Sequence, residues 1–124
     1  MKENAKFLKC PICDNIIELI DGDIQHITCC GGKMEEIKAN TTDAATEKHI
    51  PVYEKVEDEI VVRVGEAEHP MEKEHYIMWI AQVTENRTTR VRLYPEQATE
   101  TRFPYIPGAM LYAYCNKHGL WMAK

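Results

Sequence analysis

The residues best suited to chemistry lie near the end of the chain, where a cysteine and a histidine stand three positions apart as Cys115 and His118. The 124-residue chain contains five cysteines and five histidines. Four of the cysteines fall within the first thirty residues, so Cys115 is the only thiol of the remaining chain, which it shares with His49, His69, His75 and His118. One soft sulfur ligand combined with several imidazoles is typical of a transition-metal site. We therefore treat these five residues as one candidate metal site.

The four early cysteines form a second candidate metal site: Cys10, Cys13, Cys29 and Cys30. Two thiolates in a CxxC arrangement can hold one ion from a tight turn. The adjacent second pair departs from the zinc-ribbon pattern, which usually uses another CxxC, so its side chains must splay apart to reach one ion. A redox or disulfide pair is disfavoured because neighbouring cysteines bridge only with strain. The residues favour a four-thiolate site and leave its metal open between zinc and iron.

The elements that must position these cysteines are short and extended. We expect two strands and a returning segment at residues 7–9, 15–20 and 24–28. An Asp-Gly pair between the last two is a hairpin signal, and the glycines after Cys30 allow the backbone to pass closely around a metal. His26 is interpreted as a surface or strand histidine, because no ligand position requires it.

The part of the chain that carries the other histidines is expected to be an antiparallel β-sandwich. Segments rich in β-branched and aromatic residues recur about every ten residues and are separated by turn signals. The expected strands cover residues 52–56, 60–64, 75–83, 88–94, 101–103 and 109–114. The third is apolar on both faces, which predicts a central strand. Because the candidate ligands fall at the ends of these segments, loops at one end of the sandwich can bring them together.

Composition and charge disfavour several classes of function. The formal net charge is −5, which argues against nucleic-acid binding because phosphate contacts need a basic surface. No apolar run approaches the roughly 20 residues of a membrane span, and the charged N-terminus predicts no signal peptide. We expect a cytoplasmic protein, in which thiols stay reduced and paired cysteines more often bind metal than form disulfides.

Three motifs extend these two constellations. They are Cys10-Pro11-Ile12-Cys13 with Cys29-Cys30; Glu47-Lys48-His49-Ile50-Pro51-Val52 followed by His69-Pro70-Met71 and His75-Tyr76-Ile77; and Cys115-Asn116-Lys117-His118-Gly119-Leu120-Trp121. With them the chain closely resembles desulfoferrodoxin, the family of two-domain iron superoxide reductases. The resemblance covers nearly the whole chain, and residues 85–107 are the least distinctive. It implies an all-β protein with a small desulforedoxin-like metal-binding domain at 1–38 and an immunoglobulin-like antiparallel β-sandwich, the superoxide reductase domain, at 39–124.

The resemblance also implies two iron ions per chain. The first would be held by Cys10, Cys13, Cys29 and Cys30. The second, the catalytic iron, would have Cys115 on its axis and four equatorial imidazoles from His49, His69, His75 and His118. Its sixth position would be open in the ferrous state. Lys48 would be the cation near this open position, and Glu47 would be a ligand of the ferric resting state.

The implied activity is the one-electron reduction of superoxide to hydrogen peroxide, which protects against oxidative stress without producing dioxygen. Because the chain has neither a GxGxxG motif nor a P-loop, electrons must come from an external donor such as rubredoxin. The family also implies a homodimer. One alternative is a two-centre iron electron-transfer protein without its own turnover, which would gain nothing from an open coordination position. Another is a zinc-ribbon interaction module fused to an immunoglobulin-like binding domain, which leaves the histidines and Cys115 without a role.

Overall fold

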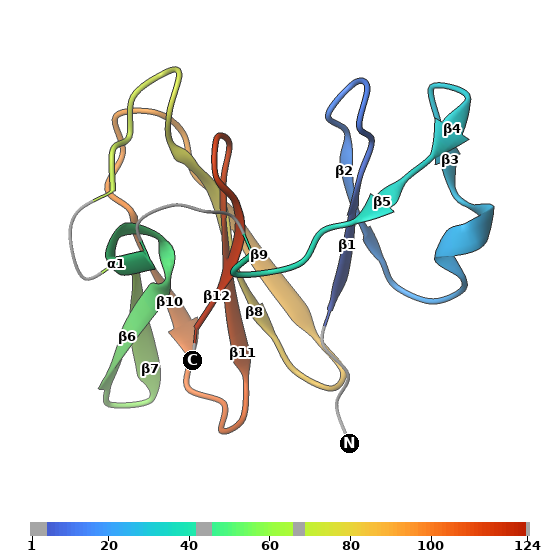
Figure 1. Cartoon of the computed structure of the whole chain (residues 1–124). Coiled ribbons are helices and arrows are strands. Elements are labelled where there is room, and N and C mark those ends of the chain that lie inside the picture. Colours follow the sequence, from blue (N-terminus) through green and yellow to red (C-terminus); the bar gives the residue numbers. More distant parts are fainter. Residues whose placement is uncertain (1–4, 42–45, 66–68, 124) are drawn as a thin grey trace. The chain divides into compact units, whose positions relative to one another are not determined.

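A computed structural model of the chain describes residues 5–41, 46–65 and 69–123. The described chain is built from β-strands, with one short α-helix and one 3-10 turn between them. It divides into two compact units, Glu3–Lys38 and Ala39–Lys124 (Figure 1). Within the described ranges, no helix has the length and apolar character that crossing a membrane requires. The expectation of an all-β protein is confirmed.

The first unit is built on a hairpin whose turn carries Cys10 and Cys13. Strand β1 (Lys6–Lys9) pairs antiparallel with β2 (Ile16–Leu19) on one side and with β5 (Glu35–Glu36) on the other. Its buried core consists of Leu8, Cys10 and Met34. Units of this size bury too little apolar surface to be stable alone and commonly rely on a metal. Cys10 therefore serves the core and the candidate metal site together.

The returning segment at residues 24–28, which was expected to be extended, begins instead with a turn. Ile24–His26 forms a 3-10 turn, because the Asp23 carboxylate accepts a hydrogen bond from the backbone N–H of Gln25 at 2.9 Å and caps it. A hairpin follows one segment later, where β3 (Thr28–Cys29) pairs with β4 (Gly32–Lys33). The local cap overrides the hairpin signal of the preceding Asp-Gly pair.

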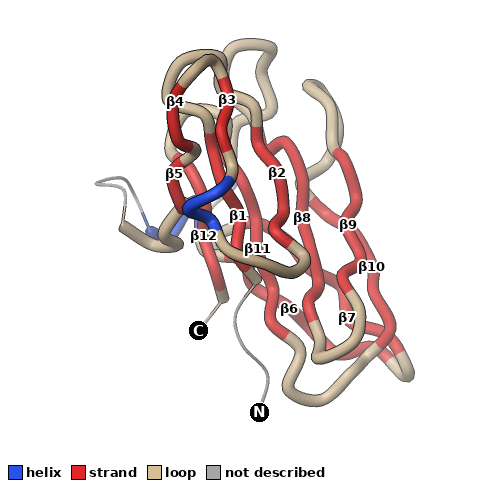
Figure 2. The backbone as a smooth tube through the Cα atoms, turned by 90° about the vertical axis from the view of Figure 1, so that its right-hand side faces the viewer, coloured by secondary structure: helices blue, strands red, loops and turns tan. Residues whose placement is uncertain are grey.

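The second unit is a sandwich of two antiparallel sheets, whose strands can be followed in Figure 2. One sheet has the strand order β10-β7-β6 and the other β12-β11-β8-β9. The strands are β6 (Pro51–Val56), β7 (Glu59–Val64), β8 (Ile77–Val83), β9 (Thr88–Arg92), β10 (Glu100–Pro104), β11 (Met110–Cys115) and β12 (Gly119–Met122). The first six match the expected strands to within two residues at each end. Strand β12 was not predicted.

The core of the second unit lies between its two sheets. Strand β7 buries Ile60, Val62 and Val64 in alternation, and the facing sheet contributes Ile80 and Leu111 to the same cluster. Burying an aliphatic side chain contributes about 1.5–3 kcal/mol relative to exposing it. As expected for a central strand, β8 lies between β11 and β9 and is buried almost throughout. This rigid strand provides the base from which the segment before it reaches the metal site.

Candidate metal centres

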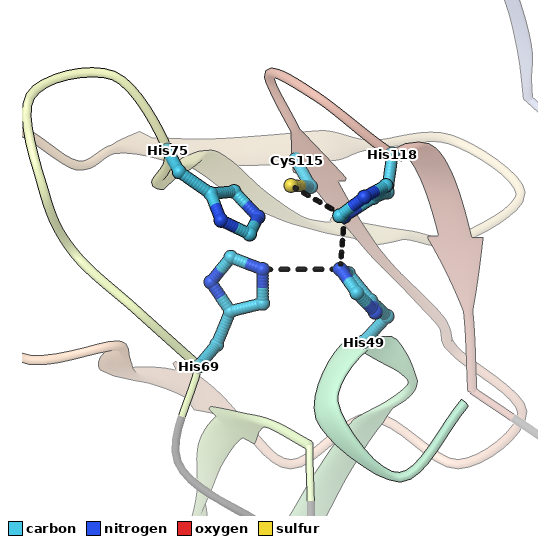
Figure 3. Close-up of side chains that lie close together, drawn as sticks. All are labelled: His49, His69, His75, Cys115 and His118. Atoms are coloured by element: carbon cyan, nitrogen blue, oxygen red, sulfur yellow. Dashed lines mark hydrogen bonds between the residues drawn. The ribbon is translucent and has the colours of Figure 1, made fainter. Parts of the chain in front are cut away.

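Five side chains from three separate segments converge on one point, as Figure 3 shows. We name them the histidine–cysteine group: His49, His69, His75, Cys115 and His118. The first ends the short helix α1 (Thr46–His49), the next two lie in the segment that precedes β8, and the last two lie at the β11–β12 hairpin. Their ligand atoms all lie within 4.8 Å of one another. The structure thus brings together all five residues singled out in the sequence for this site.

The four imidazoles form a closed ring in which each lies edge-on to both neighbours. Centroid separations are 4.6 Å for His49–His69, 4.8 Å for His69–His75, 4.9 Å for His75–His118 and 4.8 Å for His118–His49, with interplanar angles from 74° to 86°. The buried Cys115 Sγ lies 3.9 Å from His118 Nδ1. This arrangement suits four imidazole donors around one ion together with a single thiolate.

The hydrogen-bonding pattern of the ring fits a bound cation. His69 Nδ1 lies 2.7 Å from the carbonyl oxygen of Pro70, so Nδ1 carries the proton and Nε2 presents a lone pair. His49 Nε2 lies 3.1 Å from both His69 Nε2 and His118 Nδ1, yet it has at most one proton to donate. Among the described residues, the buried His75 Nε2 has no hydrogen-bond partner. Lone pairs that converge without protons between them are costly when buried, and a cation removes that cost.

Burial prepares two of the imidazoles, those of His69 and His75, to bind a cation, because it favours their neutral form. It lowers the pKa of His69 to about 4 and also lowers the pKa of His75. Burial raises the pKa of the Cys115 thiol, while the backbone N–H groups of Lys117 and His118 lower it. At neutral pH these two imidazoles can bind without losing a proton, whereas the thiol must lose one. A cation in the group supplies the charge that favours the thiolate.

Backbone irregularities aim Cys115 at the imidazoles. Strand β11 pairs with β8 in regular register as far as Tyr114 and Trp79, after which Cys115 pairs with Ile77 and one residue of β8 is skipped. Such bulges commonly redirect side chains beside functional sites. The chain then turns and pairs Cys115 with Gly119, whose φ of 82° is a conformation that glycine adopts easily. The turn returns the chain so that the fourth imidazole stands beside the thiol.

The early cysteines form the second group, which we name the four-cysteine group: Cys10, Cys13, Cys29 and Cys30. Their sulfur atoms all lie within 4.8 Å of one another. The Sγ atom of Cys29 lies 3.4 Å from that of Cys13 and 3.9 Å from that of Cys30. All five cysteines of the chain are free thiols, as expected for metal ligands.

A tight turn explains how adjacent cysteines reach the same point. Cys29 ends β3 and pairs with Gly32, so the two residues between them make the turn. Both have positive φ, 55° at Cys30 and 77° at Gly31, as in the hairpin turns that match strand twist. The conformation is uncommon for a cysteine and directs the two side chains differently. The expected splaying of the pair is thus achieved by left-handed backbone.

The thiols of this group affect one another's ionisation. Hydrogen bonds from the backbone N–H of Cys13 and then of Ile12 lower the pKa of Cys10 to about 7. The neighbouring sulfur atoms, that of Cys13 foremost, raise the pKa of Cys29 to about 12. Hydrogen bonding with Cys13 is also the main cause that raises the pKa of Cys30. One thiolate forms readily here but four do not without a cation among them, so this donor set also fits a metal ion.

The structure gives different amounts of information on the remaining predicted site residues. Lys48 lies in α1 directly before His49 and is exposed. The side chain of Glu47 lies outside the described part of the chain. His26 is exposed and belongs to neither metal group. Trp121 donates a hydrogen bond from Nε1 to the carbonyl oxygen of His118 at 3.1 Å.

The fold and the two donor sets define an all-β metalloprotein with one four-thiolate site and one site of four imidazoles and a thiolate. Residues 41–124 match the family described as Desulfoferrodoxin. The chain is 42% identical to a desulfoferrodoxin of Syntrophotalea carbinolica, over 100% of this chain and 99% of that protein. It is 36% identical to a desulfoferrodoxin homolog of Archaeoglobus fulgidus, over 99% of each. The chain belongs to the desulfoferrodoxin family.

Solved structures agree with this assignment. The superoxide reductase of Treponema pallidum aligns with a TM-score of 0.77 and 31% identity, over 98% of this chain and 100% of that one. A neelaredoxin-type superoxide reductase of Archaeoglobus fulgidus aligns with a TM-score of 0.51 and 26% identity, over 63% of this chain and 86% of that one. The family binds iron at both groups, so the expectation of two iron ions per chain is confirmed.

Proposed function

We propose that this protein is a superoxide reductase, which converts superoxide, one electron and two protons into hydrogen peroxide and releases no dioxygen. The observation that carries the proposal is the convergence of four imidazoles and one buried thiol within 4.8 Å. These five residues would hold an iron ion, which would supply the electron for the substrate. The reaction protects the cell against oxidative stress.

Each member of the histidine–cysteine group has a defined part in this proposal. The four neutral imidazoles hold the metal without adding negative charge, which would repel an anionic substrate. Cys115 contributes the anionic donor, and a thiolate ligand increases electron density at iron. Its burial, at 0% exposure, keeps competing hydrogen-bond donors in water away from the sulfur. The group thus combines a strong electron donor with a site that accepts an anion.

Lys48 is the residue that we assign to attracting the substrate. It is exposed and directly precedes His49, and it stands on a chain of net charge −5, which as a whole repels superoxide. A local positive charge raises the encounter rate with an anion. Glu47 is proposed as a ligand of the ferric resting state, because a carboxylate is a hard ligand suited to ferric iron.

The source of the electron, the oligomeric state and the roles of the two domains complete the proposal. An external donor such as rubredoxin reduces the protein in the cytoplasm, and the chain acts as a homodimer. Residues 1–38 are the desulforedoxin-like domain and residues 39–124 the superoxide reductase domain. The exposure of Cys13 and Cys30 favours an electron-relay role for the four-cysteine iron, since a ligand at the surface permits close approach of a donor.

The first test combines metal content, visible spectrum and superoxide stoichiometry on the full chain. We expect two irons per chain, a pink ferric tetrathiolate spectrum and an added broad red-absorbing band on oxidation. Starting from protein whose histidine–cysteine iron is ferrous, pulses of superoxide should yield one hydrogen peroxide and oxidise one such iron for each superoxide consumed, with no dioxygen. Release of dioxygen would instead identify a dismutase. Metal loading without accelerated loss of superoxide would favour the alternative, a two-centre electron-transfer protein.

A further inference from the structure

Asn116 extends the pairing between β11 and β8 beyond the point where both strands end. Its backbone N–H donates to the carbonyl oxygen of Tyr76 at 3.2 Å. Its side chain then accepts from the backbone N–H of Tyr76 at 2.9 Å and donates to the carbonyl oxygen of Glu74 at 2.9 Å. A carboxamide has the donor and acceptor of a peptide group, so the Asn116 side chain stands in for the next residue of a strand.

These three hydrogen bonds tie down the two residues on either side of His75. This ligand lies outside β8, which begins at Ile77, and its own backbone forms only an isolated bridge with Glu72, at 2.9 and 3.1 Å. Its Nε2 has no hydrogen-bond partner among the described residues. Placement of the His75 imidazole therefore depends strongly on the backbone that Asn116 holds.

The other imidazoles of the group have supports of different kinds. His69 is fixed through its own ring, by the 2.7 Å contact between Nδ1 and the carbonyl oxygen of Pro70. His118 is fixed through its carbonyl oxygen, which accepts from Trp121 Nε1 at 3.1 Å. For His75 the corresponding support is the Asn116 carboxamide, which acts on the neighbouring peptide groups.

We propose that Asn116 is a positioning residue of the histidine–cysteine site. It holds the backbone around His75 in place relative to the hairpin that carries Cys115 and His118. Because Asn116 directly follows Cys115, a single residue connects the thiolate to an imidazole from a distant segment. The inference rests on the proposed function of this site and extends it to a residue that touches no ligand atom. Loss of such outer partners typically weakens metal binding about 10–100-fold.

Both ends of the carboxamide are required by this geometry. The Tyr76 N–H needs an acceptor and the Glu74 carbonyl oxygen needs a donor. Asn116→Asp keeps the acceptor but places an anionic oxygen against that carbonyl, so it should rescue part of the function. Asn116→Ala removes both bonds and should have the larger effect.

Gln97 provides a control because it makes the same pair of bonds to one residue elsewhere, in the segment between β9 and β10. Its side-chain oxygen accepts from the backbone N–H of Tyr94 at 2.8 Å. Its backbone N–H donates to the carbonyl oxygen of Tyr94 at 3.2 Å. Gln97→Ala therefore loses an equivalent side-chain hydrogen bond without releasing Glu74 or Tyr76.

The experiment uses the iron-loaded full chain and its Asn116→Ala, Asn116→Asp and Gln97→Ala variants. We expect both alanine variants to unfold at lower temperature. Only Asn116→Ala should release histidine–cysteine iron to a chelator about 10–100-fold more readily and change the electron paramagnetic resonance of that ferric site. Asn116→Asp should fall between Asn116→Ala and the parent chain. The four-cysteine iron is the internal control and should keep its spectrum in every variant.

Amide hydrogen exchange gives a readout that does not depend on iron. In the zinc-substituted chain, the Tyr76 amide should exchange faster in Asn116→Ala than in the parent and remain protected in Asn116→Asp. Unchanged exchange and unchanged iron release in Asn116→Ala would overturn the inference, as would an identical spectral change in Gln97→Ala. These outcomes are distinct from failure of the proposed function, in which the parent chain binds iron at this group but does not reduce superoxide.

Discussion

The indole of Trp121 is stacked on the imidazole of His49, with ring centroids 4.9 Å apart and planes inclined by 21°. The same indole hydrogen-bonds the carbonyl oxygen of His118 at 3.1 Å. One side chain, only 1% exposed, therefore supports two ligands that are far apart in the sequence of the second unit. Strand β12 carries this residue, so the last strand is part of the metal site as well as of the sheet.

Substitution of Trp121 separates its two contacts. Trp121→Phe keeps an aromatic ring against His49 but removes the donor to the His118 carbonyl oxygen. We expect the free energy of unfolding to fall by about 1 kcal/mol, because the part-buried carbonyl oxygen of His118 loses its hydrogen bond. Trp121→Leu also removes the stack and should cost more. Denaturant unfolding of the iron-loaded chain measures both, and equal stability of the Phe variant and the parent would contradict the role of the hydrogen bond.

Removal of one sulfur from each site should affect only that site. Cys115→Ser should abolish the red-absorbing thiolate-to-iron band and most superoxide reduction, since the anionic donor is lost. Cys13→Ser is the reciprocal control; this residue is exposed, so little packing is lost, and only the pink tetrathiolate spectrum should disappear. Visible spectroscopy and superoxide pulses on both variants provide the measurement. A Cys115→Ser protein that retained its band and its rate would refute the assignment of the catalytic iron.

The charge of Lys48 should matter for the rate and not for the fold. Lys48→Ile removes the positive charge that we assign to attracting the substrate. At about 4 Å in water one charge pair is worth about 1 kcal/mol, so we expect about a fivefold slower reaction at low salt. The salt dependence of the rate should weaken as well.

Lys55→Ile makes the same change in net charge on the exposed side of β6. This variant should react with superoxide nearly as fast as the parent chain. Superoxide pulses over a range of ionic strength distinguish the two variants. If Lys48→Ile and Lys55→Ile reacted equally fast at low salt, the Lys48 assignment would be wrong.

The turn of the four-cysteine group contains neighbouring glycines that should respond differently to alanine. A Cβ at Gly31 or Gly32 would meet no atom within 4 Å, but only Gly31 has a positive φ, 77°. Gly31→Ala should cost about 1–2 kcal/mol, because an L-residue is strained in this conformation. Gly32→Ala should be close to neutral. The rate at which a chelator removes the four-cysteine iron measures this difference between the variants. Equal rates in the two variants would show that backbone strain at Gly31 does not determine how firmly the iron is held.

Strand prediction succeeded where hydrophobic pattern and burial agree. Residues 60–64 alternate between buried positions in the core and more exposed positions. Residues 77–83 are apolar enough to lie between two other strands. Prediction failed at Ile24–His26, where a local Asp23 cap favours a 3-10 turn. It also missed β12, which at four residues is too short to show a pattern of its own and depends on pairing with β11.

The sequence by itself determined the chemistry available to this protein. The types and spacing of its cysteines and histidines separate a four-thiolate set from a set of four imidazoles and one thiolate, and the motifs around them identify the family. Tertiary structure alone decided how these residues meet. It selects Nδ1 of His118 but Nε2 of His49 and His69 as the converging atoms, and it makes Asn116 a support for His75. Such choices depend on sheet register, on a bulge and on turn conformations between distant segments, which local propensity does not encode.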